Sequence, residues 1–367
     1  MKPCDSSGAP PEVDESVNGM LEISRESGAK SWDDYLTGQR EALFSHVFAW
    51  GETLATVYDL PIFRLAAVDA RTRRICGILP LVLFRPPGKV GRLISLPYTD
   101  AAGIVADDPP ATRRLFRAGL ELADELGAAH LEIRQAGELP GSPAGWNGDW
   151  NHVAHQFKTG LRRTLAPSPA EQWSKLTAKV RNQVRKAEKS GAVVKVGGEG
   201  LLADFYAVFS ENMRDLGSPV HAPELFQNLL RHPSLCSAIL VIYLQATPAA
   251  AAMVFQQGGM LFNPWAASLR RYRPACPNML LYWAMLEHAI ACGCSWFDFG
   301  RSSPAAPTCR FKRQWGARLE PLTWHAFSRG TQGWDPRDET LEDQDWKALE
   351  LERSRREGPP LRRWISL

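Results

Sequence analysis

The sequence predicts an α/β protein whose two halves repeat one structural unit. Both halves contain the order helix, glycine, strand, as ELADELGAAHLEIR and as LEHAIACGCSWFDFGR. Aligning Gly127 with Gly293 places Glu132 opposite Asp298. Short apolar segments separated by turns recur along the chain, which is typical of sheet strands. With 367 residues, the chain is long enough for two domains.

Composition and charge exclude several classes of protein. Hydrophobic residues make up 44% of the chain and charged residues 23%, as in ordinary globular proteins. The net charge of +3 excludes a globally basic nucleic-acid binder, so any basic patch must be local. No apolar run reaches the roughly 18 residues of a membrane span. Seven cysteines without metal-ligand spacing, and no visible signal peptide, predict reduced thiols, no metal site and a cytoplasmic protein.

The first half is expected to be a small sheet with two helices. Residues 1–30 are rich in Ser, Gly, Pro and Glu and are expected to be disordered. Helices are expected over 45–58 and 110–126, and Gly127 ends the second one. The expected strands are IFRLAAVDA, RICGILPLVLF, RLISLP, HLEIR and HQFKTGLRRTL. We place the first domain at residues 31–166.

A basic helix is expected from Ser168 to Gly191. Ser168 is a good N-cap, and glycine is a common C-terminal stop. One apolar stripe is formed by Trp173, Leu176, Val180, Val184 and Ala187. Arg181 and Arg185 lie one turn apart beside this stripe, where two guanidinium groups can bind one phosphate or carboxylate. The lysines of the opposite face are expected to lie in solvent.

The second domain is expected to span residues 167–330. A helix over 202–216 carries Arg214, and the turn GSPVH after it is a candidate binding segment. AILVIYLQ, AAMVFQQ and MLFNPWAAS predict three antiparallel neighbours, and LEPLTWHAF predicts a last strand. Pro277 opens a helix that ends at Ala291. Residues 331–367 are expected to be a charged tail with one short peripheral helix.

Two stretches carry candidate site residues. In WFDFGRSSPAAPTCRFKRQW a strand is expected to break at Gly300 and to restart at 310–312. Asp298, Arg301 and Lys312 then lie at or beyond the strand end, where ligands bind in α/β domains. The alternative is a surface loop with solvated charges. In SLPYTDAAG, Tyr98 and Asp100 follow an apolar strand; the alternative there is a plain turn.

These stretches resemble the FemAB-type peptidyltransferases of the GNAT acyltransferase superfamily. The resemblance rests on CPNMLLYWAMLEHAIACGCSWFDFGRS, FKRQWG, SLPYTDAAGIVADD, KVRNQVRKAEKSG and FYAVFSENMRDLGSPVH. It covers roughly residues 30–330 and is strongest to the branch associated with exosortase and PEP-CTERM exopolysaccharide loci. It implies tandem GNAT-like domains, each with a mixed, mostly antiparallel central sheet flanked by helices.

The resemblance also implies an N-acyltransferase. The acceptor would be an amine of a cell-envelope precursor, such as one of peptidoglycan or exopolysaccharide, on a small molecule or a lipid- or nucleotide-linked sugar. The donor could be an acyl-CoA, an acyl carrier protein or an aminoacyl-tRNA. No Ser-His-Asp order or nucleophilic cysteine signature is visible, which favours direct transfer without an acyl-enzyme. Two alternatives remain open: a non-catalytic anion- or RNA-binding module, and a scaffold of a polysaccharide export system.

The candidate roles follow from this hypothesis. Asp298 would accept a proton or orient the amine; its alternative role is a structural partner of Arg301. Arg301 and Lys312 would hold phosphate or carboxylate groups or stabilise the oxyanion, and the family uses a lysine in the region of Lys312. Tyr98 and Asp100 would line the acceptor cleft. The candidate substrate-binding arginines are Arg181, Arg185, Arg214 and Arg301. The sequence departs from the family in having no long coiled-coil arm and a looser DAAG segment, and no glycine-rich phosphate loop precedes a helix.

Overall fold

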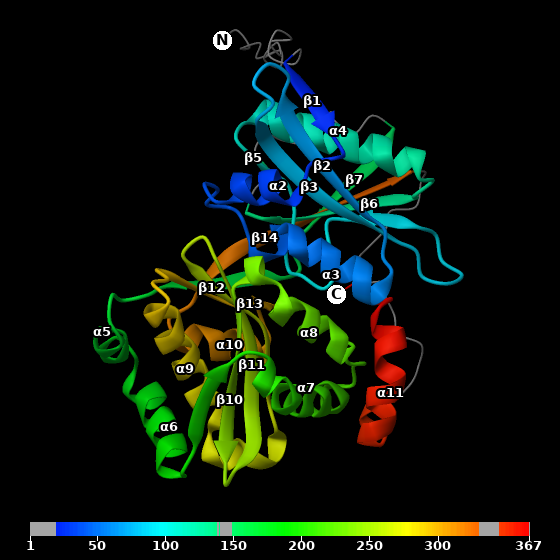
Figure 1. Ribbon diagram of the computed structural model, residues 1–367. Coiled ribbons are helices and arrows are strands. Elements are labelled where there is room, and N and C mark those ends of the chain that lie inside the picture. Colours follow the sequence, from blue (N-terminus) through cyan, green and yellow to red (C-terminus); the bar gives the residue numbers. More distant parts are fainter. Residues whose placement is uncertain (1–19, 138, 140–148, 330–344, 367) are drawn as a thin grey trace, which may run out of the picture.

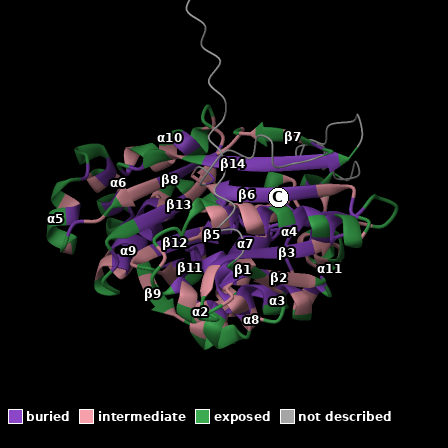
Figure 2. Cartoon of the chain, turned by 90° about the horizontal axis from the view of Figure 1, so that it is seen from above, coloured by how far each residue is buried: buried purple, intermediate pink, exposed green. Residues whose placement is uncertain are grey.

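The protein has a mixed α/β fold built on one large sheet. The computed structural model describes residues 20–137, 139, 149–329 and 345–366. Fourteen strands of these ranges form a continuous, mostly antiparallel sheet with helices packed against it (Figure 1). Seen from above, buried residues follow the strands and exposed residues gather on the outer helices (Figure 2). The predicted α/β class is confirmed, and no helix among the described residues is long and apolar enough to cross a membrane.

The strand order places residues far apart in the sequence side by side. In spatial order the strands are β1 (Leu21–Ser24), β2 (Ile62–Asp69), β3 (Ile75–Phe84), β4 (Arg92–Ile94), β6 (His130–Ala136), β14 (Arg318–Arg329), β8 (Thr159–Thr164), β13 (Trp296–Ser302), β12 (Met260–Ser268), β11 (Thr247–Gln257), β10 (Ser237–Leu244) and β9 (Val193–Gly197). Off this path, β5 (Val105–Ala106) pairs with β3 and β7 (Trp150–His155) pairs with β14. The antiparallel series β10, β11, β12 is as predicted.

Helices cover both faces of the sheet. In the first half these are α2 (Ala29–Leu36), α3 (Phe48–Tyr58) and α4 (Pro109–Glu125). Asp108 is the N-cap of α4, and its carboxylate accepts a hydrogen bond from the Ala111 amide. In the second half they are α5 (Pro169–Ser174), α6 (Ala178–Lys189), α7 (Leu202–Leu216), α8 (Pro223–Arg231), α9 (Pro277–Ala291) and α10 (Pro307–Gln314). The last helix is α11 (Leu351–Arg362), which lies beside α7 (Figure 1).

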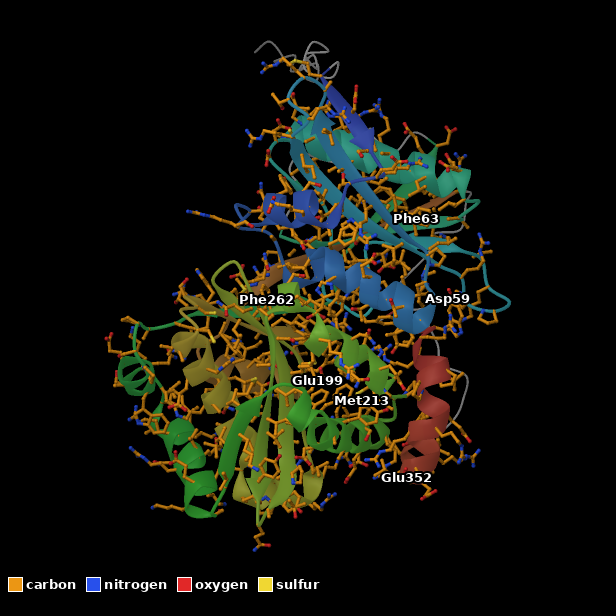
Figure 3. All side chains as sticks on the ribbon, viewed as in Figure 1. Asp59, Phe63, Glu199, Met213, Phe262 and Glu352 are labelled. Carbon is orange, nitrogen blue, oxygen red and sulfur yellow. The ribbon has the colours of Figure 1, made fainter. Side chains whose placement is uncertain are left out.

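One apolar core joins the two halves. It contains side chains of α3 and of the segment before it, together with side chains of α7, α8 and β11. Phe44 stacks on Phe255, and its ring centroid lies 5.2 Å from that of Phe262. Phe262 accordingly lies between the halves (Figure 3). Because aromatic rings contribute large buried areas, this contact fixes the halves against each other.

Strand β14 also crosses from one half to the other. Its first part, Arg318–Pro321, pairs with β8, and its second part, Leu322–Ser328, pairs with β6. Strand β8, which the sequence places in the first domain, pairs with β13 of the second half on its other side. The sheet is therefore continuous across the expected boundary at residues 166 and 167.

The internal repeat expected from the sequence is present in the backbone. Gly127 and Gly293 both have left-handed φ angles, +61° and +73°, at the ends of α4 and α9. The residue after each glycine donates a hydrogen bond to the fifth residue before it, as Ala128 to Ala123 and as Cys294 to Ala289. Each helix then leads into a parallel pair, β4 with β6 and β12 with β13, of three residue pairs.

Four local expectations are wrong. Residues 21–24 are not disordered but form β1, paired with β2. The single basic helix is two helices, because Thr177 caps a new helix by accepting a hydrogen bond from the Val180 amide. The strand does not break at Gly300, and residues 310–312 lie in α10 rather than in a restarted strand. The tail also contains a longer helix than expected, α11, and residues 330–344 lie outside the described ranges.

Candidate active site

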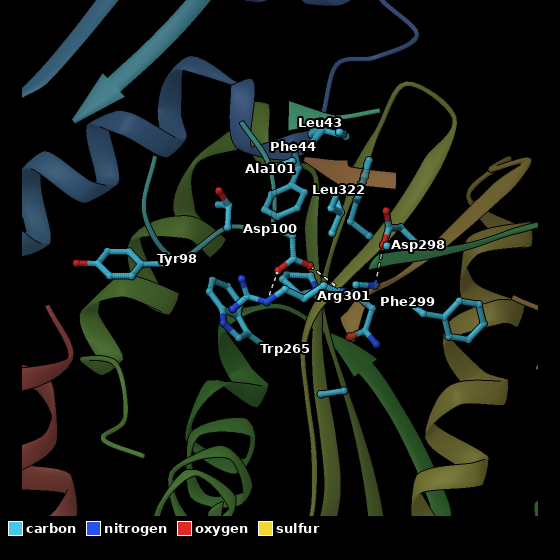
Figure 4. Close-up of a pocket in the computed structure, with 18 of the residues that line it drawn as sticks. Leu43, Phe44, Tyr98, Asp100, Ala101, Trp265, Asp298, Phe299, Arg301 and Leu322 are labelled. Carbon is cyan, nitrogen blue, oxygen red and sulfur yellow. Dashed lines mark hydrogen bonds and ion pairs between the residues drawn. The ribbon is translucent and has the colours of Figure 1, made fainter. Parts of the chain in front are cut away.

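A cavity opens where two parallel strands separate. Strands β12 and β13 pair from Met260 and Trp296 to Phe262 and Asp298, and no further pair joins them among the described residues. Beyond this point both strands continue and line a cavity of about 490 Å³ (Figure 4). Strands that separate leave backbone N–H and C=O groups facing the gap. The cavity therefore has main-chain groups as well as side chains on its walls.

A bulge in β13 shapes the wall of the cavity. The register with β8 shifts between Asp298 and Arg301, and Gly300 has a φ angle of +70°. A Cβ atom at residue 300 would lie 3.2 Å from the Asn263 carbonyl oxygen and 3.7 Å from Lys312 Nζ. Glycine is thus required here both for the left-handed backbone and for the close approach of its neighbours.

Asp298 is held by two hydrogen bonds at the edge of the cavity. Its Oδ2 accepts one from Arg162 Nε at 2.8 Å, and its Oδ1 accepts one from the Gly300 amide at 2.6 Å. The residue is 9% exposed. An ionised carboxylate is a strong acceptor for both donors, so Asp298 fixes the bulge and the Arg162 side chain together.

Asp100 reaches this site from the first half of the chain. Its Oδ2 accepts a hydrogen bond from the Arg301 amide at 2.8 Å, and its Oδ1 lies 3.1 Å from Arg301 Nε. Trp324 Nε1 donates a hydrogen bond to the Asp100 carbonyl at 3.1 Å. Dashed lines join the labelled side chains of Asp100 and Arg301 at the cavity, and Asp298 lies beside them (Figure 4).

Lys312 approaches the same bulge from α10. Its Nζ donates a hydrogen bond to the Arg301 carbonyl at 2.7 Å, which is its only hydrogen bond among the described residues. Burial lowers the pKa of Lys312 to about 8, and the Asp100 and Asp298 carboxylates only partly oppose this effect. A lysine with such a pKa is partly neutral near neutral pH and can exchange a proton with a bound molecule.

Residues 174–313 match the acetyltransferase (GNAT) domain family model. The match contains Asp298 and Lys312 and leaves Tyr98 and Asp100 outside. No curated protein sequence matches the chain.

Solved structures share the fold of the chain. The structure of FemX aligns with a TM-score of 0.66 at 16% identity and covers 82% of this chain and 96% of its own. L-PGS from Bacillus licheniformis aligns with a TM-score of 0.56 at 11% identity, covering 94% and 99%. A tandem GNAT protein from the clavulanic acid biosynthesis pathway aligns with a TM-score of 0.50 at 12% identity, covering 85% and 99%. The tandem GNAT-like fold predicted from the sequence is confirmed.

Tyr98 also lines the cavity, but its hydroxyl group is engaged elsewhere. The ring packs edge-on against Tyr58 and His221, and the hydroxyl donates a hydrogen bond to the Arg363 carbonyl. Burial raises the pKa of Tyr98 above its ordinary value. The ring is therefore a neutral, apolar wall of the cavity.

Three of the predicted arginines do not reach the cavity. Arg181 Nη1 donates hydrogen bonds to the carbonyl of Ser174, the last residue of α5, and to that of Leu176, and so joins α5 to α6. The Arg185 guanidinium lies 5.4 Å from the ring centre of Trp173, and Arg214 Nη2 lies 2.8 Å from Asp215 Oδ1. None of the three is a lining residue. Arg181 and Arg185 lie one turn apart on α6, but neither side chain lines the cavity.

Other lining residues escaped the sequence analysis. The most relevant are Arg162, Asn263, Trp265, Glu320 and Arg362. A polar residue inside an apolar strand is a usable signal, and Asn263 in MLFNPWAAS gives it. Arg362 gives no such signal, because it comes from α11 and meets the cavity only through the tertiary fold. The described residues contain no group of three or more side chains suited to a metal ion.

Proposed function

We propose that the protein is an acyltransferase that transfers an acyl or aminoacyl group directly to an amine of a cell-envelope or exopolysaccharide precursor. The observation that carries this proposal is the cavity between β12 and β13, which contains Lys312 with its lowered pKa beside Asp100 and Asp298. The GNAT domain match and the shared fold support an acyltransferase. The acceptor class rests on the sequence resemblance alone.

The separated strands offer a place for the donor. A donor with amide groups, such as an acyl-CoA, can bond with the backbone groups that β12 and β13 leave unpaired, as an added strand does. At the far end of β12, residues 270–275 form a basic turn that leads to the N-terminus of α9. Backbone N–H groups at a helix N-terminus bind phosphate, and Arg273 adds positive charge there, whereas Arg271 is paired with Glu211. We place the donor phosphates at this turn rather than at Arg181 and Arg185.

The chemistry needs a proton acceptor and a cation near the carbonyl group. The acceptor amine attacks the donor carbonyl carbon, a C–N bond forms, and the C–S or C–O bond to the leaving group breaks. Lys312 in its neutral form takes the proton that the amine loses and passes it through water to the leaving group, which restores neutral Lys312. Arg301 Nη1 is buried without a hydrogen-bond partner among the described residues and can stabilise the developing oxyanion.

The two carboxylates orient these groups in the proposal. Asp298, to which the sequence analysis gave the proton-accepting role, is bonded to Arg162 and to the Gly300 amide. Both of its carboxylate oxygens are thus already occupied by hydrogen-bond donors. Asp100 fixes the Arg301 side chain and backbone. We therefore assign proton transfer to Lys312 and positioning to Asp298.

Calorimetric titration with acyl-CoA donors tests the donor site. Wild-type protein is expected to bind in a saturable manner, and Arg273→Ala is expected to weaken binding about tenfold or more, because one charged contact to a phosphate is worth about 1.5–3 kcal/mol. Arg181→Ala is the matched control and is expected to bind like the wild type. Equal loss in both variants, or loss only in Arg181→Ala, would refute the placement. Absence of binding would transfer the donor role to aminoacyl-tRNA or to a carrier protein, and saturable binding without turnover would favour the binding module.

A further inference from the structure

The first half contains a counterpart of the cavity. Strand β4 pairs with β6 up to Ile94 and Glu132, as β12 pairs with β13 up to Phe262 and Asp298. The backbone hydrogen bonds just before the two parallel pairs also agree. The Ala129 amide donates to the Gly91 carbonyl before β4, and the Ser295 amide donates to the Gly259 carbonyl before β12. Glu132 is therefore the structural equivalent of Asp298, and Arg134 is the equivalent of Gly300.

Residues 362–366, here called the inserted segment, lie where this counterpart would open. The Tyr98 amide donates a hydrogen bond to the Ser366 carbonyl at 2.9 Å. Arg134 Nη1 donates to the same carbonyl at 2.8 Å, and Arg134 Nη2 donates to Ser366 Oγ at 2.7 Å. Arg92 Nη2 also donates to Ser366 Oγ, at 3.2 Å. Ser366 is 1% exposed, so it is enclosed as a ligand would be.

The groups that hold Ser366 form a built site rather than a surface contact. Arg134 and Glu132 are fully buried and form an ion pair of 2.5 Å. A buried guanidinium needs its N–H groups satisfied, and Ser366 accepts from two of its nitrogen atoms. Where the second half has a glycine that leaves space, the first half has this arginine, which points its donors at a carbonyl and a hydroxyl group.

The same contacts hold the loop that carries Asp100. Leu96 and Tyr98 have left-handed φ angles of +60° and +65°, which non-glycine residues rarely adopt without support from their surroundings. The inserted segment supplies that support, because its carbonyl groups accept hydrogen bonds from the amide and the hydroxyl group of Tyr98. Two residues further, Asp100 binds the bulge of the cavity.

A second connection runs through Trp324. The guanidinium groups of Arg134 and Arg301 lie 4.1 Å and 5.6 Å from its ring centre, and its indole N–H bonds the Asp100 carbonyl. The inserted segment also contributes Arg362 to the cavity wall. Contacts through the Trp324 side chain thus connect the occupied site of the first half with the cavity of the second half.

We propose that the first half contains a binding site for a peptide segment, that the inserted segment occupies this site in the same chain, and that its occupation holds Asp100 at the cavity. The ligand class is a peptide that presents a backbone carbonyl and a small hydroxyl side chain to Arg134. The segment is accordingly a positioning element for Asp100 and touches no reacting atom.

Hydrogen exchange of the full chain, measured by mass spectrometry over residues 95–102, tests this proposal. Ser366→Arg places a cation against Arg134 and Arg92 and is expected to expel the segment. Exchange in this loop is then expected to become at least tenfold faster, because the Tyr98 amide loses its acceptor. Leu361→Arg is the matched control: Leu361 is already 42% exposed, and exchange is expected to stay as in the wild type.

A synthetic peptide of residues 361–367, added to the Ser366→Arg protein, is expected to slow the exchange again in a saturable manner. The same peptide carrying Ser366→Ala is expected to need at least tenfold higher concentration. Unchanged exchange in a folded Ser366→Arg protein, or a peptide without effect on it, overturns the proposal. If Ser366→Arg does not fold, Ser366→Ala in the full chain decides: faster exchange in the loop supports the proposal, and wild-type exchange overturns it.

One kinetic consequence rests on the proposed function. Asp100 is predicted to line the acceptor cleft, so Ser366→Ala is expected to raise the KM for the acceptor several-fold and to leave the KM for the donor unchanged. An equal change in both constants would indicate a general loss of structure instead. The exchange and peptide experiments need no turnover, so they decide on the peptide site even if the proposed reaction is wrong.

Discussion

Replacing Lys312 by methionine is expected to stabilise the protein near neutral pH. Burial lowers the pKa of this lysine from 10.5 to about 8, so the charged form is disfavoured in the folded state. At about 1.4 kcal/mol per pKa unit, the difference corresponds to about 3 kcal/mol. Methionine keeps the apolar stem but loses the hydrogen bond to the Arg301 carbonyl, which offsets about 1 kcal/mol. The expected net gain at pH 7 is about 2 kcal/mol.

The sign of the pH dependence follows from the same pKa values. Between pH 8 and pH 10.5 the unfolded chain binds more protons at Lys312 than the folded protein does, so wild-type stability rises with pH over this window. The methionine variant lacks this rise. Its advantage is therefore expected to be full at pH 7 and lost by about pH 10.5.

Urea denaturation at pH 7, 8, 9 and 10 measures the difference in the free energy of unfolding between the wild type and Lys312→Met. The contributions of all other titrating groups are the same in both proteins and cancel in this difference. The control is Lys179→Met at an exposed position of α6, where a change within about 0.5 kcal/mol is expected at every pH. A methionine variant that is destabilised at pH 7, or whose difference from the wild type does not change with pH, would refute a desolvated Lys312.

Three further predictions concern the site and its supports. Gly300→Ala is expected to lower stability by about 2 kcal/mol or more, since it adds a close contact to a left-handed backbone; Gly127→Ala, with open space around it, should cost only the backbone part of about 1 kcal/mol. Burial lowers the pKa of His46 to about 4, so wild-type stability should fall by about 3 kcal/mol as pH drops from 6.5 to 4, and His46→Gln should reduce that fall. Arg134→Met should cost about 3–5 kcal/mol by leaving Glu132 buried without its partner.

Denaturation curves check all three predictions. Equal losses in the two glycine variants would contradict the close approach at the bulge. A pH dependence that His46→Gln leaves unchanged would assign the acid sensitivity to other groups. For the buried pair, the additional change Glu132→Gln should restore part of the stability that Arg134→Met loses, and no restoration would show that the loss is one of packing.

The sequence predicted those parts of the fold that depend on local patterns. The glycine-terminated helices α4 and α9, the strands after them and the antiparallel series β10 to β12 carry their signals in short stretches. The division between α5 and α6 depends on Thr177, a residue with an N-cap preference that the apolar stripe obscured. Helix α10 was missed although Pro307 occupies its first turn, because the preceding loop resembled a strand connection.

The candidate site was predictable only where its residues are near in sequence. The sequence predicted Asp298, Arg301 and Lys312 as site residues, because one short stretch combines aromatic, glycine and charged residues. Arg162 and Arg362 come from β8 and α11, and pairing across the sheet and packing of distant segments bring them to the cavity. Such non-local contacts leave no periodic pattern in a single sequence.

The most direct test of the central claim is an acyl-transfer assay by mass spectrometry. Wild-type protein and Lys312→Met are compared with acyl-CoA and aminoacyl-tRNA donors and an amine-bearing cell-envelope precursor over pH 6 to pH 9. Wild-type turnover is expected to rise with pH and to level above about pH 8, where Lys312 becomes neutral, and Lys312→Met is expected to lose at least a hundredfold. Turnover that Lys312→Met leaves unchanged, or a wild-type rate that does not rise with pH, would contradict the central claim.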